Sequence, residues 1–243
     1  MADVVLEIEQ FTKYYGKKLA VEKLSFSLFA GEFMSLVGPN GAGKSTTINA
    51  LTGQLVPSEG KVRVAGKDLW QDPLEAKRQL GYVAQEPVLP RHLTAREYMA
   101  FVGAVKKLDT KACEKEAAEL LEVGDMLDSQ DYAIGEYSLG MAKKVALAAA
   151  LLGSPKALVL DEAFAGLDPE AVRRYRDVLT SRRDKGAAVL FATHVLETVE
   201  RISDAVALIA KGKLLSMLRG AELKAVVDGE GGLEGHYLRV VAK

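Results

Sequence analysis

The chain has 243 residues, of which 49% are hydrophobic and 27% charged, and its formal net charge is −1. This length is enough for one α/β domain with a large core. The balanced charge argues against a strongly basic surface, so we expect no nucleic-acid partner. The single cysteine, Cys113, excludes an internal disulfide framework and is expected to be an inert thiol on a helix.

No segment has the pattern of a targeting signal or a membrane span. The N-terminal MADVVLEIEQ has no basic start followed by an apolar stretch, so we expect no signal peptide. The most apolar region, 145–160, is interrupted by Gly153-Ser154-Pro155-Lys156 and is therefore not expected to cross a bilayer. We expect a cytoplasmic protein that needs another chain for any work on a membrane.

The first third of the chain predicts strands around a glycine-rich loop. Alternating, aromatic or β-branched residues indicate strands over 4–10, 24–29 and 32–37. The stretch LVGPNGAGKSTTINAL follows, and its spacing of Gly38, four residues, then Gly43-Lys44-Ser45 is the phosphate-loop pattern. After the loop we expect a helix over 45–51, a strand over 61–65, a helix opened by Asp72-Pro73 and a strand over 81–84.

The glycine loop predicts a site for the phosphates of a nucleotide. In such a loop successive backbone N–H groups point at the β- and γ-phosphates, and the dipole of the following helix adds positive charge. Lys44 would neutralise the phosphates and the Ser45 hydroxyl would ligate Mg²⁺. A plain strand-to-helix turn is the alternative, but a turn has no need of that lysine and hydroxyl. The predicted loop residues are Gly38, Pro39, Asn40, Gly41, Ala42, Gly43, Lys44, Ser45 and Thr46.

The middle of the chain predicts a helical insertion over about 87–153. TARE at Thr94–Glu97 is a capping box, 111–123 has a helical pattern, and Ser138 precedes another helix in AKKVALAAALL. We expect no strong strand in this region.

The last third predicts strands and helices in alternation. Strands are expected over 157–160, 187–192 and 205–209, with one helix opened by Asp168-Pro169 and another near 196–202, so the sheet should be parallel. ALVLDEA places Asp161 and Glu162 at the carboxyl end of a buried strand, where such sheets bind ligands. A solvated acidic turn is the alternative reading of that pair. The glycine-rich end, 221–243, is expected to be a short, frayed tail.

With these motifs in this order, the chain resembles the nucleotide-binding subunits of ATP-binding cassette (ABC) transporters over about residues 4–217. Tyr15, in KYYG, stands where the family has an aromatic ring that stacks on adenine. Gln85, in GYVAQEP, matches a glutamine that contacts Mg²⁺ and faces the membrane subunit. Asp168, in AGLDP, matches the key position of the loop after the acidic pair, and His194, in FATH, matches the switch histidine near the γ-phosphate.

The signature position of the family is occupied by YSLGM at Tyr137–Met141, which departs from the common LSGGQ. Tyr137, Leu139 and Met141 are replacements, whereas Ser138 and Gly140 are retained. Ser138 caps the next helix and Gly140 leaves its first N–H groups open to an anion. In the family this helix end acts on the ATP held by a partner subunit. The variant looks like that of bacterial export-type transporters.

The resemblance implies a P-loop NTPase (RecA-like) core with a parallel sheet, an antiparallel β subdomain on the N-terminal side and an inserted helical subdomain. We expect a single domain over 1–243, with the core at 1–86 and 154–220, the helical subdomain at 87–153 and the tail at 221–243. The cofactors implied are ATP and Mg²⁺, the latter on Ser45, Gln85 and Asp161. Glu162 would polarise the attacking water, with His194 on the γ-phosphate.

The function implied is that of an ATP-hydrolysing subunit, peripheral to the inner face of the membrane. Two copies, or this chain and a sister, would close head-to-tail around two ATP molecules on a separate permease. A soluble ABC-type ATPase, for example of the iron–sulfur assembly type, is the alternative. A P-loop kinase or GTPase fits less well, because the guanine-reading NKxD is missing from the sequence.

Overall fold

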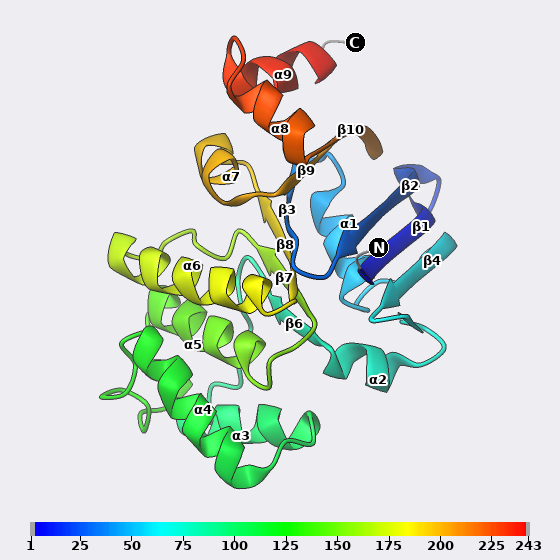
Figure 1. Ribbon diagram of the computed structural model, residues 1–243. Helices are drawn as coiled ribbons and strands as arrows, with labels where there is room; N and C mark the ends of the chain where they lie inside the picture. The colour runs from blue at the N-terminus through cyan, green and yellow to red at the C-terminus, as the bar shows by residue number, and fades with distance from the viewer. Residues whose placement is uncertain (1–2, 242–243) are drawn as a thin grey trace.

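The computed structural model describes residues 3–241, and its centre is a six-stranded sheet in the order β10-β9-β3-β8-β7-β6 (Figure 1). The strands from β9 to β6 run parallel, and β10 is antiparallel to β9. The parallel sheet confirms the prediction, although β10 was not expected. The bounds are β3 (Phe33–Val37), β6 (Leu80–Val83), β7 (Ala157–Asp161), β8 (Ala188–Thr193), β9 (Ala205–Ala210) and β10 (Lys213–Arg219).

The central strands are apolar on both faces because helices and a second sheet cover them. Every residue of β3, β7, β8 and β9 is buried. A continuous apolar run, with no alternation, is what a strand covered on both sides requires. The carboxyl ends of β3, β7 and β8 therefore open on one edge of the sheet, where the polar residues of the chain begin.

A four-stranded antiparallel sheet, in the order β2-β1-β4-β5, packs on one side of the molecule (Figure 1). Its strands are β1 (Val4–Tyr15), β2 (Lys18–Phe29), β4 (Glu59–Val64) and β5 (Lys67–Asp68). Both β1 and β2 are longer than predicted. Each contains a residue with positive φ, Gln10 at 50° and Lys23 at 45°, so the pairing continues across irregularities that look like strand ends in the sequence.

The helices cover two faces and form the predicted helical block. Their bounds are α1 (Lys44–Leu51), α2 (Pro73–Arg78), α3 (Ala95–Val105), α4 (Thr110–Val123), α5 (Leu139–Leu151), α6 (Pro169–Asp184), α7 (Leu196–Ile202), α8 (Gly220–Val227) and α9 (Gly232–Val241). The capping box at Thr94 and Glu97 is confirmed, and Asp168 accepts a hydrogen bond from the Ala171 N–H at 2.7 Å. Asp72 precedes α2 but makes no side-chain cap.

Three apolar clusters hold these layers together. One joins α1 and the antiparallel sheet to one face of the central sheet. A second joins the other face to α3, α4, α5 and α6, and it contains Cys113. That thiol is buried, as expected of an inert cysteine on a helix. Among residues 3–241, no helix is both long and apolar enough to cross a bilayer.

The C-terminal region is not a frayed tail over the part that the structure describes, so that expectation was wrong. Residues 220–241 form α8 and α9, and Leu223 and Leu233 are buried. They join a third cluster with Val37, Val199 and Leu208. The glycines of DGEGGLEG turn the chain between two helices, because Gly231 and Gly232 both adopt positive φ. The last two residues of the expected tail lie outside the described residues.

Candidate functional site

The glycine loop leaves β3 and leads directly into α1, as the sequence predicted. Gly43 is the residue before α1, with φ of 105° and no side-chain cap, so the first N–H groups of the helix are not taken up by a capping side chain. A Cβ at Gly38 would lie 2.2 Å from the Ile209 carbonyl oxygen, so the loop must have glycine there to pass the end of β9. The result is a helix N-terminus suited to an anion.

Lys44 lies across the start of its own loop. Its ammonium donates to the carbonyl oxygens of Gly38 at 2.6 Å and Pro39 at 3.2 Å. Burial lowers the pKa of Lys44, and the carboxylates of Glu162 and Asp161 oppose that shift. The ammonium is therefore already directed toward the mouth of the loop and close to two acidic groups.

Asp161 ends β7 and Glu162 follows it; both lie beside this loop and are buried, with 7% and 9% of their surface exposed. Burial, followed by the charge of Glu162, raises the pKa of Asp161 to about 6, while Lys44 lowers it. Glu162 has a φ of 45°, a left-handed conformation that a non-glycine residue rarely adopts. Two buried carboxylates on adjacent residues repel each other, and a cation between them and a phosphate would relieve that repulsion.

His194 contacts Glu162 directly, a pairing that the sequence did not predict. The His194 Nδ1 atom lies 2.6 Å from Glu162 Oε1, and the His194 backbone N–H donates to the same oxygen at 3.1 Å. The Thr193 hydroxyl donates to the other oxygen, Oε2, at 3.2 Å. Both oxygens of the carboxylate are thereby fixed in direction by the end of β8.

These elements enclose one cavity of about 770 Å³. It gathers most of the predicted site residues, whereas Gly38 and Ala42 support the loop from behind. It also has lining residues that the sequence analysis missed: Lys18, Leu19 and Ala20 at the start of β2, and Lys211 on the β9–β10 turn. The first three could have been predicted, because they follow shortly after Tyr15 in the sequence. The predicted residues in the cavity are Tyr15, Pro39, Asn40, Gly41, Gly43, Lys44, Ser45, Thr46, Gln85, Asp161, Glu162 and His194.

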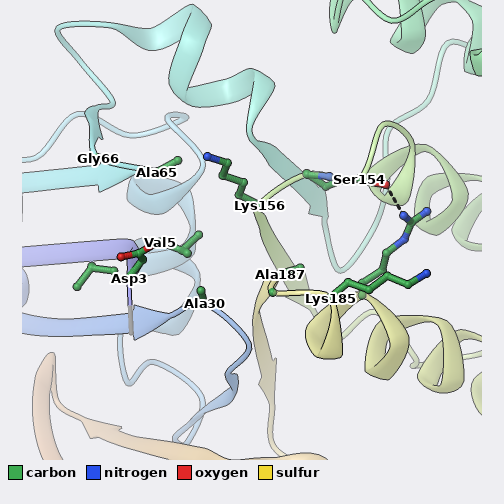
Figure 2. A pocket seen from close by; sticks show the side chains of 13 residues that line it. Asp3, Val5, Ala30, Ala65, Gly66, Ser154, Lys156, Lys185 and Ala187 are labelled. Atoms are coloured by element: carbon green, nitrogen blue, oxygen red, sulfur yellow. Dashed lines mark hydrogen bonds between the residues drawn. The ribbon is translucent and has the colours of Figure 1, made fainter. Parts of the chain in front are cut away.

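A second cavity, of about 590 Å³, lies at the opposite end of the strands and contains none of the predicted residues (Figure 2). Asp3 and Val5 line it from the start of β1, and Lys156 and Lys185 line it from the segments before β7 and after α6. Ligands of open α/β sheets bind at the carboxyl ends of the strands. We therefore assign the chemistry to the first cavity.

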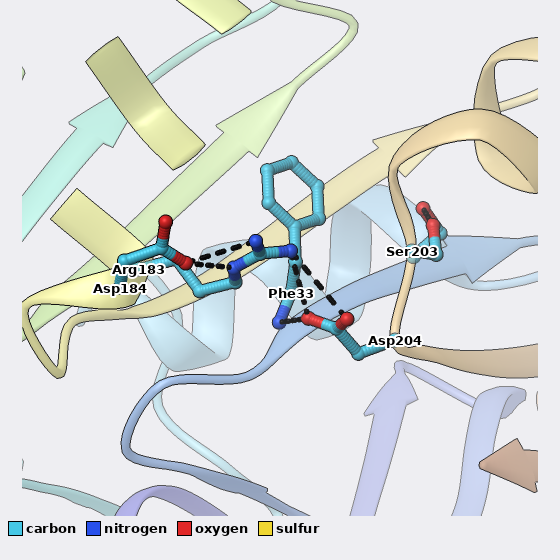
Figure 3. Close-up of polar contacts among 6 residues, drawn as sticks. Phe33, Arg183, Asp184, Ser203 and Asp204 are labelled. Carbon is cyan, nitrogen blue, oxygen red and sulfur yellow. Dashed lines mark hydrogen bonds and ion pairs between the residues drawn. The ribbon is translucent and has the colours of Figure 1, made fainter. Parts of the chain in front are cut away.

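A polar cluster behind the site ties the far ends of β3 and α7 together (Figure 3). Asp204 accepts a hydrogen bond from the Phe33 N–H at 2.9 Å and pairs with Arg183 at 3.3 Å. The Ser35 and Ser203 hydroxyls lie 2.6 Å apart. Since β3 leads into the glycine loop and α7 begins two residues after His194, this cluster joins two elements that border the cavity.

The signature residues lie elsewhere on the molecule and do not line the cavity. Ser138 precedes α5 and its hydroxyl accepts from the Met141 N–H at 3.2 Å. Asp168, also outside the cavity, pairs with Lys144 at 3.1 Å and so ties the start of α6 to α5. A Cβ at Gly140 would meet the Gly166 carbonyl oxygen at an ordinary 3.5 Å. The structure thus separates Ser138, Gly140 and Asp168 from the other predicted residues of the same chain.

Comparison with known proteins matches residues 21–165 to the family model described as "ABC transporter". The linearmycin resistance ATP-binding protein LnrL of Bacillus subtilis (strain 168) is 33% identical over 93% of this chain and 73% of its own length. The Nod factor export ATP-binding protein I of Sinorhizobium fredii (strain NBRC 101917 / NGR234) is 35% identical over 87% of this chain and 62% of its own length. A solved ATP-binding subunit of an ABC transporter superposes with a TM-score of 0.92 at 28% identity, covering 98% of this chain and 99% of that one.

Proposed function

This chain belongs to the family of ABC transporter ATP-binding proteins, which hydrolyse ATP, and we propose that it powers export through a separate membrane permease. The observation that carries the proposal is the cavity in which Lys44, the acidic pair and His194 meet at the glycine loop. Two relatives support export as the direction, since one acts in Nod factor export and one in linearmycin resistance.

The residues divide the work of hydrolysis between them. The N–H groups of the glycine loop and the Lys44 ammonium bind the β- and γ-phosphates, and the Tyr15 ring, 49% exposed at the cavity wall, stacks on adenine. Glu162 accepts a hydrogen bond from the attacking water and polarises it. Because His194 and Thr193 hold both carboxylate oxygens, that orientation exists before water arrives. The free Nε2 of His194 remains available to the γ-phosphate.

Mg²⁺ fits the donors that line the cavity. Mg²⁺ prefers oxygen ligands and usually takes one or two carboxylates together with substrate phosphates, not a cage made of protein alone. Asp161, Ser45 and Gln85 line the same cavity and supply one carboxylate, one hydroxyl and one amide oxygen. The raised pKa of Asp161 marks a carboxylate that a cation would stabilise in its charged form. When bound, Mg²⁺ neutralises charge on the β- and γ-phosphates.

A second cassette, either another copy or a sister chain, completes each ATP site. Ser138 and Gly140 lie at the N-terminus of α5, outside the cavity of their own chain, and Leu139 beside them is 58% exposed. A helix N-terminus with a capped but outward-facing first turn is suited to a phosphate carried by a partner. Head-to-tail closure would place this end against the γ-phosphate held by the other chain.

The permease is proposed to dock beside Gln85. A groove of about 490 Å³ lies between β6, α3 and α5, and the chain that follows Gln85 forms one wall. It is lined by apolar side chains such as Leu89, Tyr98 and Val102, and Val88 at its rim is 96% exposed. Exposed apolar surface of this kind marks an interaction site. This observation supports a membrane partner over the soluble ABC-type ATPase, and with such a partner the chain would lie at the inner face of the membrane.

Membrane sedimentation from the native host tests the docking site. Wild-type chain should sediment with membranes, and Val88→Asp should shift it largely to the soluble fraction because the carboxylate would lose its hydration when the permease covers the groove. Leu238→Asp on α9, where the side chain is 60% exposed and outside the groove, is the matched control and should sediment as wild type. Equal sedimentation of both variants would exclude this groove as the docking site.

A further inference from the structure

The β9–β10 turn places a lysine in the nucleotide cavity that none of the family motifs accounts for. Ala210 pairs with Lys213, so the hairpin loop consists of Lys211 and Gly212, with φ of 49° and 76°. Positive φ at both central residues is the type I′ turn, for which Asn-Gly is strongly preferred. Lys211 lines the cavity together with Tyr15 and Lys44.

This turn is fixed against the glycine loop. The Gly212 N–H donates to the Ala42 carbonyl at 2.9 Å, and the Gly212 carbonyl accepts from the Glu22 N–H at 2.8 Å. A Cβ on Gly43 would lie 3.6 Å from Gly212 Cα, so turn and loop are in contact. Lys211 therefore starts from a backbone that is positioned by the phosphate-binding loop itself.

The acidic residues and Lys211 lie on different flanks of the cavity. The sheet order β9-β3-β8-β7 puts the end of β9 and the end of β7 on opposite flanks of β3, whose end becomes the glycine loop. Asp161 and Glu162 lie on the β7 flank. Among the residues that the structure describes, Lys213 pairs with Glu22 at 3.0 Å, whereas no carboxylate forms an ion pair with Lys211. The β9 flank thus has an uncompensated cation facing the same cavity.

We infer that Lys211 is a nucleotide-binding residue that contacts the base-proximal phosphate, on the side away from the acidic pair. The inference rests on the proposed assignment of this cavity to ATP. The γ-phosphate belongs on the flank of Glu162 and His194, and Tyr15 receives the base, so a cation on the β9 flank meets the part of the phosphate chain between them. A lysine acts there as a point charge for phosphate.

Two substitutions separate the charge from the turn. The chain already uses an Ala-Gly pair, Ala65-Gly66 with φ of 49° and 77°, in the hairpin loop between β4 and β5, so Lys211→Ala should keep the fold. Lys211→Asn introduces the residue that the type I′ turn prefers. Lys17→Ala is the control, because Lys17 is an exposed lysine of the β1–β2 loop that does not line the cavity.

Calorimetric titration of each protein with ATP, ADP and AMP tests the inference. Both Lys211 variants should bind all three nucleotides about three- to tenfold more weakly than wild type, by a similar factor for each, and the difference should shrink at high salt. The melting temperature of Lys211→Asn should equal or exceed that of wild type. Lys17→Ala should bind as wild type.

The other possible results separate a failure of the role given to Lys211 from a failure of the proposed function. Wild-type affinities in both Lys211 variants would overturn this inference and leave the proposed function intact. A loss for ATP without a loss for ADP and AMP would place Lys211 at the γ-phosphate and overturn the assignment to the base-proximal side. No ATP binding by the wild-type chain itself would instead remove the proposed function on which the inference rests.

Discussion

Two helix N-termini in this chain are suited to phosphate, and they differ in almost every other respect. The start of α1 has a left-handed glycine in place of a capping side chain, and it opens into a cavity with Lys44 and two carboxylates. The start of α5 is capped by Ser138, faces outward and does not line that cavity. The difference supports the proposal that one chain carries the nucleotide-binding part of one ATP site at α1 and only the opposing wall of another at α5.

The largest effect is expected from changing Glu162, the proposed catalytic base beside α1. Glu162→Gln keeps the shape of the side chain but removes its charge, so turnover should fall by about 10²–10⁴, while ATP still binds. Release of phosphate from purified protein measures the rate. Size-exclusion chromatography of the variant with ATP and no Mg²⁺ should show accumulation of a dimer. Hydrolysis close to the wild-type rate would remove Glu162 from its proposed role.

Gly140→Asp tests whether the start of α5 acts only across a dimer. A carboxylate there would face the γ-phosphate of the partner, and like charges brought together at an interface cost several kcal/mol, so closure and hydrolysis should be lost. Binding of ATP to the monomer should survive. Gly140→Ala is the matched control, because a Cβ at this position meets no atom closer than 3.5 Å.

Mixing the Gly140→Asp chain with a Lys44→Ala chain tests directly whether two chains share each site. Lys44→Ala disables the nucleotide-binding part at α1 and Gly140→Asp disables the opposing wall at α5, so a mixed dimer has one site with both parts sound. Some hydrolysis should return on mixing. If Gly140→Asp alone hydrolyses ATP at the wild-type rate at every protein concentration, each subunit works unaided and the two-chain site is wrong.

Tyr15→Ala tests the end of the α1 cavity that is proposed to hold the adenine base. Loss of an aromatic ring stacked on a base costs about 1–3 kcal/mol, so ATP should bind roughly 5- to 150-fold more weakly. Fluorescence titration with an ATP analogue measures the change. Tyr14→Ala is the control, since Tyr14 is 44% exposed but does not line the cavity. A loss in Tyr14→Ala alone would shift the stacking role by one residue.

Ser138→Ala is expected to give the smallest effect of these variants. It should lower stability slightly and should separately slow hydrolysis. Removing the cap of α5 should lower the free energy of unfolding by about 1 kcal/mol. Thr94→Ala removes a similar cap from α3, away from the ATP cavity, and should cost about as much. Denaturant unfolding compares the two. Only Ser138→Ala should also slow hydrolysis, and equal hydrolysis by both variants would reduce Ser138 to a helix cap.

The sequence predicted most of the residues that line the cavity, and the cap of α3, because these signals are local. The loop spacing, the Asp161–Glu162 pair after an apolar run and the capping box at Thr94 each lie within a few residues. The pairing of His194 with Glu162 could not be predicted, because it joins the ends of β8 and β7 through the sheet register. The residue roles and the subdomain boundaries themselves stay predictions.

The elements that the sequence missed owe their structure to distant partners. Strand β10 forms by pairing with β9. Helix α9 is held by Leu233, whose N–H donates to the Glu200 carboxylate at 2.9 Å and whose side chain is buried. Local composition around Gly231 favours a loose end, and the packing against α7 overrides it. Lys211 was missed for the same reason, since only the fold brings its turn to the glycine loop.

The left-handed backbone of Glu162 has a consequence for anyone who engineers this protein. A non-glycine residue in that conformation costs roughly 1–2 kcal/mol, and here the residue also buries a charge next to Asp161. Glycine at 162 would relieve both penalties and remove the proposed catalytic base. Directed evolution for heat tolerance alone would therefore enrich chains that survive heating and no longer turn over ATP, so any such selection must score hydrolysis in every round.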